Sequence, residues 1–331
     1  ACYPGSKVWF ENRFHRVADP FRHPIDGIKS LLTPIGSLGD KLRVGMMRMG
    51  LLSSKSIPDN CTTRDALNKM GFSDSMTDRF WKPFMRGVFL ENELSTTIRK
   101  FEETFRFFSK GETVLPKNGI GEIPRQLAGQ LPRNNILLET EISKVDTNSV
   151  ESSDGRTWKG RAVVLATEDY YANQLLGLGT QVDDWNSVDC LYYSLPVDDL
   201  PSDEPILYLD GTGDGPINNL TFISTLCDCS PLGQALVSVS VIGQKEMNLD
   251  EIADKAKQQL IHWFGKKGKK WEFVKGYRIR KAVPTCQNLP IPKPVLTRVY
   301  RCGDYFGLPS IDSAMKSGRL TAEHIIQDQK S

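Results

Sequence analysis

The segment VYRCGDYFGLPSIDSAMKSGRLTAE, residues 299–323, predicts a short strand, a Gly-Asp turn, a loop and a closing helix. Ser310 has the side chain of a helix N-cap, and Asp312 places a carboxylate in the first turn. The free amide groups at the start of this helix favour an electron-rich ligand. The segment therefore combines a turn and a helix N-terminus in an arrangement that suits ligand binding.

Small residues follow one another along this helix. Ala314, Gly318 and Ala322 recur every four positions, so they share one helix face. Glycine inside a helix costs about 1 kcal/mol relative to alanine. We therefore expect Gly318 to serve the close approach of another backbone.

Three motifs in the segment carry a family resemblance: the aromatic-x-x-Gly-Asp of Tyr300–Asp304, the Pro-Ser of 309–310 and the Ala-x-x-Ser-Gly of Ala314–Gly318. Together they resemble the C-terminal flavin-binding motif of the FAD-dependent amine oxidase superfamily, which includes protoporphyrinogen oxidases and phytoene-type desaturases. In that family the Asp lies by the ribityl–phosphate region of FAD, and the helix start lies near the flavin pyrimidine edge. The resemblance implies cofactor contacts at Gly303, Asp304, Ser310, Ile311 and Ala314. The alternative is an ordinary strand–turn–helix.

Composition narrows the class of protein. The chain has 331 residues, enough for two domains, with 39% apolar and 25% charged residues. A net charge of +2 gives no reason to expect nucleic-acid binding. The sequence has no run of eighteen apolar residues, so we expect no transmembrane helix.

The cysteines do not form a disulfide pattern. Seven are scattered without regular spacing, which favours a reducing intracellular compartment or organelle. The close pair Cys227 and Cys229 lacks a second pair, and the chain has four histidines, so no metal site is predicted.

The first 110 residues predict a hairpin and a helical lobe. The hairpin spans Lys7–Val17, and helical patterns fill Ile25–Lys110. The many Phe, Met and Trp residues are explained by core packing, or they enclose a bulky apolar substrate. The basic helix around Lys41–Arg48 contacts a membrane surface or presents an ordinary solvated face.

Residues 111–185 supply a second point of resemblance. We expect strands over Asn135–Thr140, Ile142–Val145 and Trp158–Ala166, and a helix from Glu168. In the superfamily such a block leads through a strand on the adenine side of FAD to a strand of the type Val-Val-Leu-Ala-Thr. The resemblance implies cofactor contacts at Ile142 and Ala166.

The remaining residues complete the predicted organisation. Strands fill most of 186–285, interrupted by a helix over Leu249–Phe264 and a basic loop at Lys266–Lys270. The resemblance implies an α/β plus α+β fold: an incomplete glutathione-reductase-type Rossmann FAD domain, interrupted by a substrate domain with a mixed sheet and a helical lobe. The substrate domain comprises residues 1–110 and 186–285, and the FAD domain comprises residues 111–185 and 286–331.

One family signature is missing. The superfamily begins with a Gly-x-Gly-x-x-Gly turn that holds the FAD pyrophosphate. Gly119-x-Gly121 runs into Pro124, and Gly211-x-Gly213 lacks a third Gly at the required spacing. We therefore expect that an N-terminal segment is absent from this sequence, and that the chain alone holds FAD weakly.

The resemblance implies a FAD-dependent oxidoreductase that holds FAD non-covalently. The flavin accepts hydride from a small apolar or amine substrate. The sequence identifies no catalytic acid or base, and it leaves the substrate, electron acceptor and oligomeric state open. The alternative is a binding or scaffold protein that keeps the fold without FAD. The missing glycine signature favours this alternative.

Overall fold

The chain folds into two compact units. The computed structural model describes residues 1–178, 185–244, 246–285 and 295–328. Unit 1 comprises residues 1–126 and 187–282, and unit 2 comprises residues 127–186 and 283–331. The sequence predicted domain boundaries after residues 110, 185 and 285, whereas the units change after residues 126, 186 and 282. The largest difference between the two sets is at the first boundary.

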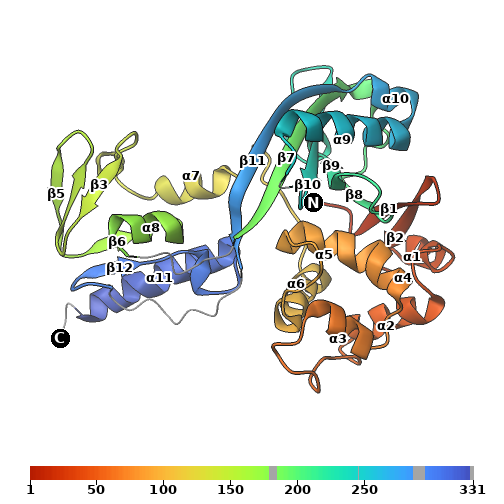
Figure 1. Cartoon of the computed structure of the whole chain (residues 1–331), viewed down its shortest axis with the longest axis horizontal. Coiled ribbons are helices and arrows are strands. Elements are labelled where there is room, and N and C mark those ends of the chain that lie inside the picture. The colour runs from red at the N-terminus through yellow and green to blue at the C-terminus, as the bar shows by residue number, and fades with distance from the viewer. Residues whose placement is uncertain (179–184, 245, 286–294, 329–331) are drawn as a thin grey trace. The chain divides into compact units, whose positions relative to one another are not determined.

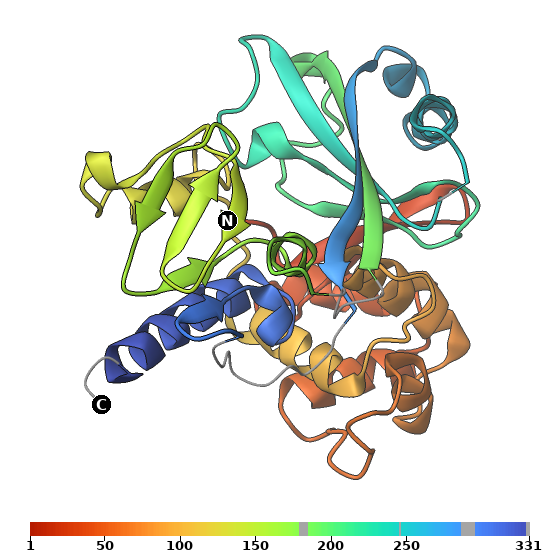
Figure 2. The ribbon, with the colours of Figure 1, turned by 60° about the vertical axis from the view of Figure 1, so that its left-hand side comes forward.

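Unit 1 is built on a mixed sheet, and Figures 1 and 2 both show its long strands β7 and β11 side by side. In spatial order its seven described strands are β11 (Glu272–Pro284), β7 (Trp185–Pro196), β10 (Gln234–Val241), β9 (Ile217–Phe222), β8 (Leu207–Asp210), β1 (Gly5–Phe10) and β2 (Arg13–Ala18). The β1–β8 pair is parallel, whereas β1–β2, β8–β9, β9–β10 and β7–β10 are antiparallel.

The predicted hairpin is confirmed as β1 and β2. Its two turn residues, Glu11 and Asn12, have φ angles of 49° and 57°. Two consecutive residues with positive φ form the tight turn that matches the twist of the flanking strands. The register pairs Phe10 with Arg13, so the hairpin closes without glycine.

One face of the sheet is covered by helix α9 (Leu249–Phe264), which has the predicted bounds. Asn248 caps α9 and forms a capping box with Glu251. Alternate residues of β10 point into this core, and Ala256 and Leu260 of α9 are fully buried against them. The predicted loop at Lys266–Lys270 is wrong: residues Lys266–Lys269 form the short helix α10, which packs on α9.

The helical lobe of unit 1 follows the hairpin. Its helices are α1 (Pro24–Leu31), α2 (Leu38–Arg48), α3 (Thr63–Lys69), α4 (Asp74–Met76), a π-helical turn over Thr77–Trp81, α5 (Lys82–Phe89) and α6 (Ile98–Lys110). Helix α7 (Glu122–Ala128) comes next, at the boundary between the units. Thr62 caps α3, and the hydroxyl of Thr63 donates to the carbonyl of Thr96.

The aromatic residues of the lobe form a packed core. Trp81 is 1% exposed and meets Phe72, Phe80 and Phe101 edge-to-face, with ring centroids 5.0–5.9 Å apart. Such pairs stabilise a core beyond the area they bury. Of the two explanations offered by the sequence, core packing accounts for these side chains.

Unit 2 contains two small sheets. Strands β6 (Val163–Leu165) and β12 (Val299–Arg301) form a parallel pair, and β3 (Ile142–Val145), β4 (Ser149–Ser152) and β5 (Thr157–Lys159) form an antiparallel meander. Helix α8 (Asp169–Leu175) packs on one face of the parallel pair through Ala172. Helix α11 (Ile311–Asp328) lies on the other face, where Tyr300 donates to Asp328.

Two strand predictions in unit 2 are wrong. Residues 136–140 are not a strand, and Leu138 is 81% exposed, because no described strand pairs with this segment. The predicted strand Trp158–Ala166 is divided at Gly160–Ala162, so β5 belongs to the meander and β6 to the parallel pair. Strands need a partner for their backbone groups, which local sequence does not specify.

Within the described ranges, no helix is long and apolar enough to cross a membrane.

The loop before β8 is tied to the hairpin by a pH-sensitive ion pair. Arg16 donates two hydrogen bonds to Glu204, at 2.6 and 2.7 Å, and Lys7 lies 3.2 Å from the same carboxylate. The Arg16 guanidinium, together with Lys7, lowers the pKa of Glu204 from 4.5 to about 2. A carboxylate with a lowered folded-state pKa stabilises the fold above its unfolded pKa, and this stability is lost as the pH falls.

We predict that Glu204→Gln lowers the free energy of unfolding by about 1–2 kcal/mol at pH 7, after allowance for partial exposure, and by much less near pH 2. Urea unfolding of both proteins across this pH range measures the difference. Glu246→Gln, at an exposed position of the same unit, is the control. A loss that does not change with pH would contradict the assignment.

Candidate functional site

Most of the predicted cofactor residues gather at one edge of unit 2. Strands β6 and β12 are parallel, with Leu165 opposite Arg301. The amide of Cys302 donates to the carbonyl of Leu165 over 3.0 Å. Ala166 and Gly303 therefore leave the sheet at the same carboxyl edge, which is where ligands bind in open α/β sheets.

Gly303 forms the turn that follows β12. Its amide donates to the Ser317 hydroxyl over 2.9 Å, which joins the turn to α11. A Cβ atom on Gly303 would lie 2.2 Å from the ring of Tyr305. The backbone here is extended, so glycine is required by this close approach and not by an unusual φ angle.

The N-terminus of α11 extends beyond this edge. Helix α11 runs antiparallel to β12, because Ser317 contacts Gly303 whereas Asp328, near the helix C-terminus, accepts from Tyr300. Its first turn, with Ile311 and Ala314, therefore lies past the carboxyl end of the strand. The predicted cap is confirmed: the Ser310 hydroxyl accepts from the Ser313 amide over 3.1 Å.

After capping, two backbone amides at the start of α11 remain without an acceptor among the described residues. Ser310 satisfies Ser313 through its side chain and Ala314 through its carbonyl. Among the described residues, no acceptor is found for the amides of Ile311 and Asp312. Unpaired amides at a helix N-terminus attract anionic or electron-rich groups.

The small-residue face of α11 is uncovered. Ala314 and Ala322 are exposed, and no heavy atom lies within 4 Å of the position of a Cβ on Gly318. The close approach expected at Gly318 is therefore absent from the described part of the chain.

Ile142 is positioned separately from the other predicted residues. It begins β3 in the meander and pairs with Ser152, so it is held by a different sheet. Val145 and Val150 of this meander pack against the core that β6 and β12 share with α8. The meander thus belongs to the same unit as the edge, but Ile142 does not lie on the parallel pair.

Three titratable side chains near the edge, those of Cys302, Tyr305 and Tyr300, are neutral near pH 7. Burial raises the pKa of the Cys302 thiol and of the Tyr305 phenol. Burial, followed by the hydrogen bond to Asp328, also raises the pKa of Tyr300. Asp304 lies half-buried at this edge, in the turn Asp304–Phe306.

Sequence reasoning missed a buried ion pair beside the edge. The Arg301 guanidinium donates to Asp169 over 3.2 Å and to the Asn173 side chain over 2.5 Å, and Asn173 donates to Asp169 over 2.8 Å. Asp169 and Asn173 are fully buried, and Arg301 is 6% exposed. In the sequence, the feature that points to this ion pair is the spacing of Asp169 and Asn173, four residues apart on α8, together with a basic residue in an otherwise apolar strand.

Unit 1 has a half-open sheet face of its own. On the side of β7 opposite α9, Tyr192 meets Tyr277 of β11 edge-to-face, and the Cys190 thiol lies 3.5 Å from the Ser238 hydroxyl. Burial, with a further contribution from Cys190, raises the pKa of Tyr192 to about 12. This face offers aromatic rings and hydroxyl groups together.

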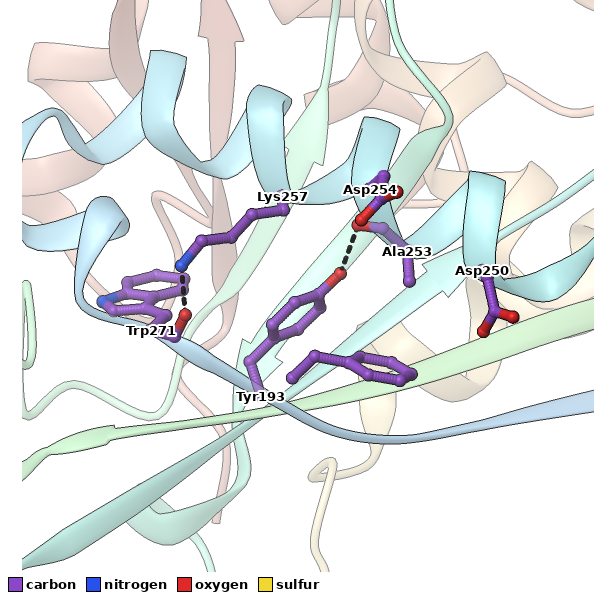
Figure 3. A pocket seen from close by; sticks show the side chains of 7 residues that line it. Tyr193, Asp250, Ala253, Asp254, Lys257 and Trp271 are labelled. Carbon is purple, nitrogen blue, oxygen red and sulfur yellow. Dashed lines mark hydrogen bonds between the residues drawn. The ribbon is translucent and has the colours of Figure 1, made fainter.

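A small pocket lies between α9 and β11, and its lining residues are better explained as packing contacts than as a ligand site (Figure 3). Its volume is about 200 Å³, smaller than ordinary ligand pockets. The Tyr193 hydroxyl donates to the Ala253 carbonyl, and Lys257 donates to the carbonyls of Gly268 and Trp271. These polar groups are engaged in holding α9 to its neighbours. Over the described residues, no cluster of His, Cys, Asp or Glu could hold a metal.

Comparison with known proteins agrees with this architecture. The family model for flavin-containing amine oxidoreductases matches residues 7–326. The chain belongs to this family. Among curated protein sequences no match is found. The predicted resemblance to the amine oxidase superfamily is confirmed.

Solved structures confirm the α/β fold of amine oxidase type. An oxidoreductase from Methanosarcina mazei has a TM-score of 0.72 at 14% identity, over 99% of this chain and 80% of its own. Putrescine oxidase bound to putrescine has a TM-score of 0.71 at 12% identity, over 98% and 81%. Cyclohexylamine oxidase from Brevibacterium oxydans has a TM-score of 0.60 at 12% identity, over 100% and 82%.

We predict that Arg301→Leu destabilises unit 2 by about 3–5 kcal/mol, because it leaves the Asp169 carboxylate buried without its cation. Arg319→Leu removes an exposed pair with Glu323 on α11 and serves as the matched control, with a loss of about 0.5 kcal/mol or less. Denaturant unfolding and hydrogen exchange of the β12 amides measure both effects. Equal losses in the two variants would show that the buried pair has no special role.

Proposed function

We propose that the protein is a FAD-dependent oxidoreductase that holds FAD non-covalently at the carboxyl edge of β6 and β12. The observation that carries this proposal is the convergence of Gly303, Asp304, Ser310, Ile311 and Ala166 at one edge, beside a helix N-terminus. Family membership supports the flavin, and the amine oxidase fold supports its position.

The residues present fit the oxygen-rich part of FAD. The turn at Gly303 leads directly to Asp304, whose carboxylate is suited to accept hydrogen bonds from ribityl hydroxyls. The unpaired amides of Ile311 and Asp312 favour electron density near the pyrimidine edge of the flavin. When bound, FAD supplies a hydride acceptor; this edge binds and orients it.

The proposed substrate is a small apolar molecule or an amine. The half-open sheet face of unit 1 supports this class, because Tyr192 and Tyr277 present apolar ring surface next to the Ser238 hydroxyl. Aromatic faces also attract ammonium groups. The names of two similar structures, putrescine oxidase and cyclohexylamine oxidase, point to amines as the first substrates to test.

The test is to express the complete gene product, reconstitute it with FAD and record its visible spectrum. We expect flavin absorbance that stays with the protein through desalting and is lost on unfolding, as for a non-covalent cofactor. Anaerobic addition of amines should then bleach it. A folded protein that takes up no FAD would favour the alternative, a binding or scaffold protein that keeps the fold.

We predict that Asp304→Ala weakens FAD binding about tenfold or more, because hydrogen bonds to a charged group are lost. Asp146→Ala, at an exposed position in the β3–β4 turn, is the control and should bind FAD normally. Titration of flavin fluorescence measures the affinity, and thermal unfolding checks that both variants are folded. Unchanged affinity in Asp304→Ala would remove Asp304 from the site.

A further inference from the structure

The helices α1 and α2 of unit 1 expose apolar side chains that a folded protein usually buries. Leu32 is 88% exposed, Ile25 72%, Ile28 64% and Leu42 61%. Leu38 and Met49 are also more than half exposed. We call these six residues the α1–α2 apolar face. Isolated exposed apolar residues are ordinary, but a contiguous group of them marks a binding surface.

The two helices lie alongside each other in opposite directions. Near the start of α2, Lys41 donates to the carbonyls of Leu31 and Thr33, at the end of α1. Near the end of α2, Arg48 pairs with Asp19, which precedes α1. These contacts fix α1 and α2 as neighbours, so their exposed residues belong to one region of the surface.

The apolar residues point away from the core on both helices. In α1 the buried residues are Gly27 and Ser30, and Ile25, Ile28 and Leu32 lie on the opposite side of the helix. The same separation holds in α2, where Asp40 and Met47 are buried. In α2, Leu38, Leu42 and Met49 form the outward stripe. Both stripes therefore face solvent.

The charge around this face is positive. Residues 19–55 contain six Lys or Arg, three Asp and no Glu. Each of the three acids has partners: Asp40 is buried and accepts from Ser37 and Ser73, Asp26 pairs with Arg16, and Asp19 pairs with Arg48.

Three basic residues border the face. Lys29 lies beside the outward stripe of α1, and Lys41 lies between the helices. Arg43 follows Leu42 in α2, and its half-buried side chain extends to Gly71. In the described part of the chain, none of the three forms an ion pair with an acidic side chain. Long basic side chains at the border of an apolar surface can reach anionic groups while their stems stay in apolar surroundings.

We propose that the α1–α2 apolar face docks the protein onto the surface of an anionic lipid bilayer. The apolar stripes enter the boundary between headgroups and acyl chains, and Lys29, Lys41 and Arg43 contact the headgroups. An anionic bilayer buries the apolar side chains and also neutralises the positive charge around them. A second copy of the chain would place like charges against each other. The proposal is independent of the flavin site.

The test is cosedimentation of the complete protein with vesicles. We expect binding to vesicles of phosphatidylserine and phosphatidylcholine, weaker binding to phosphatidylcholine alone, and release by salt. Ile28→Asp with Leu42→Asp should reduce binding more than tenfold, since each substitution removes a buried apolar side chain from the docked state. Lys29→Gln with Arg43→Gln should reduce binding about fivefold per residue.

The control is Leu232→Asp, which changes a fully exposed leucine in the loop before β10 and should bind like the wild type. All variants alter exposed or half-buried side chains, and unchanged thermal unfolding verifies that they are folded. Three results would each overturn the proposal. The wild-type protein does not bind anionic vesicles, or the Ile28→Asp/Leu42→Asp variant still binds them. The third is that the wild type is a dimer in solution and this double variant is a monomer.

Discussion

The parallel pair of β6 and β12 depends on the buried contact of Arg301 with Asp169 and Asn173. Each strand has three residues, so few backbone hydrogen bonds join them. The buried pair adds a directional contact from β12 to α8, the helix that follows β6. Burying an ion pair gains little net stability over an apolar core, but removing one partner is costly. The contact thus selects one packing of the strand against the helix, and with it the position of Gly303.

Local sequence signals were sufficient where the structure is local. The cap at Ser310, the helix Leu249–Phe264 and the hairpin of β1 and β2 each rest on contacts between residues close in sequence. The C-terminal turn was predictable for the same reason, because its functional atoms belong to consecutive residues. The family comparison then confirmed what this one segment indicated.

The sequence could not supply what depends on distant partners. Residues 135–140 have the composition of a strand, yet no described strand pairs with them. The Arg301–Asp169 contact joins residues 132 positions apart, and the spacing of Asp169 and Asn173 does not identify Arg301 as their partner. For α2 the sequence predicted a basic helix, but not that Leu42 and Met49 point outward while Asp40 is buried. Burial is a tertiary property, and tertiary contacts override local preference.

The two proposed surfaces differ in how they bind. The proposed flavin edge consists of backbone amides, small residues and Asp304, and Arg301, Ser317 and Tyr305 fix the backbone position there. The α1–α2 apolar face instead acts through side-chain chemistry, as exposed apolar area with positive charge. A fold that separates these roles can change its docking surface without moving a backbone atom at the cofactor edge.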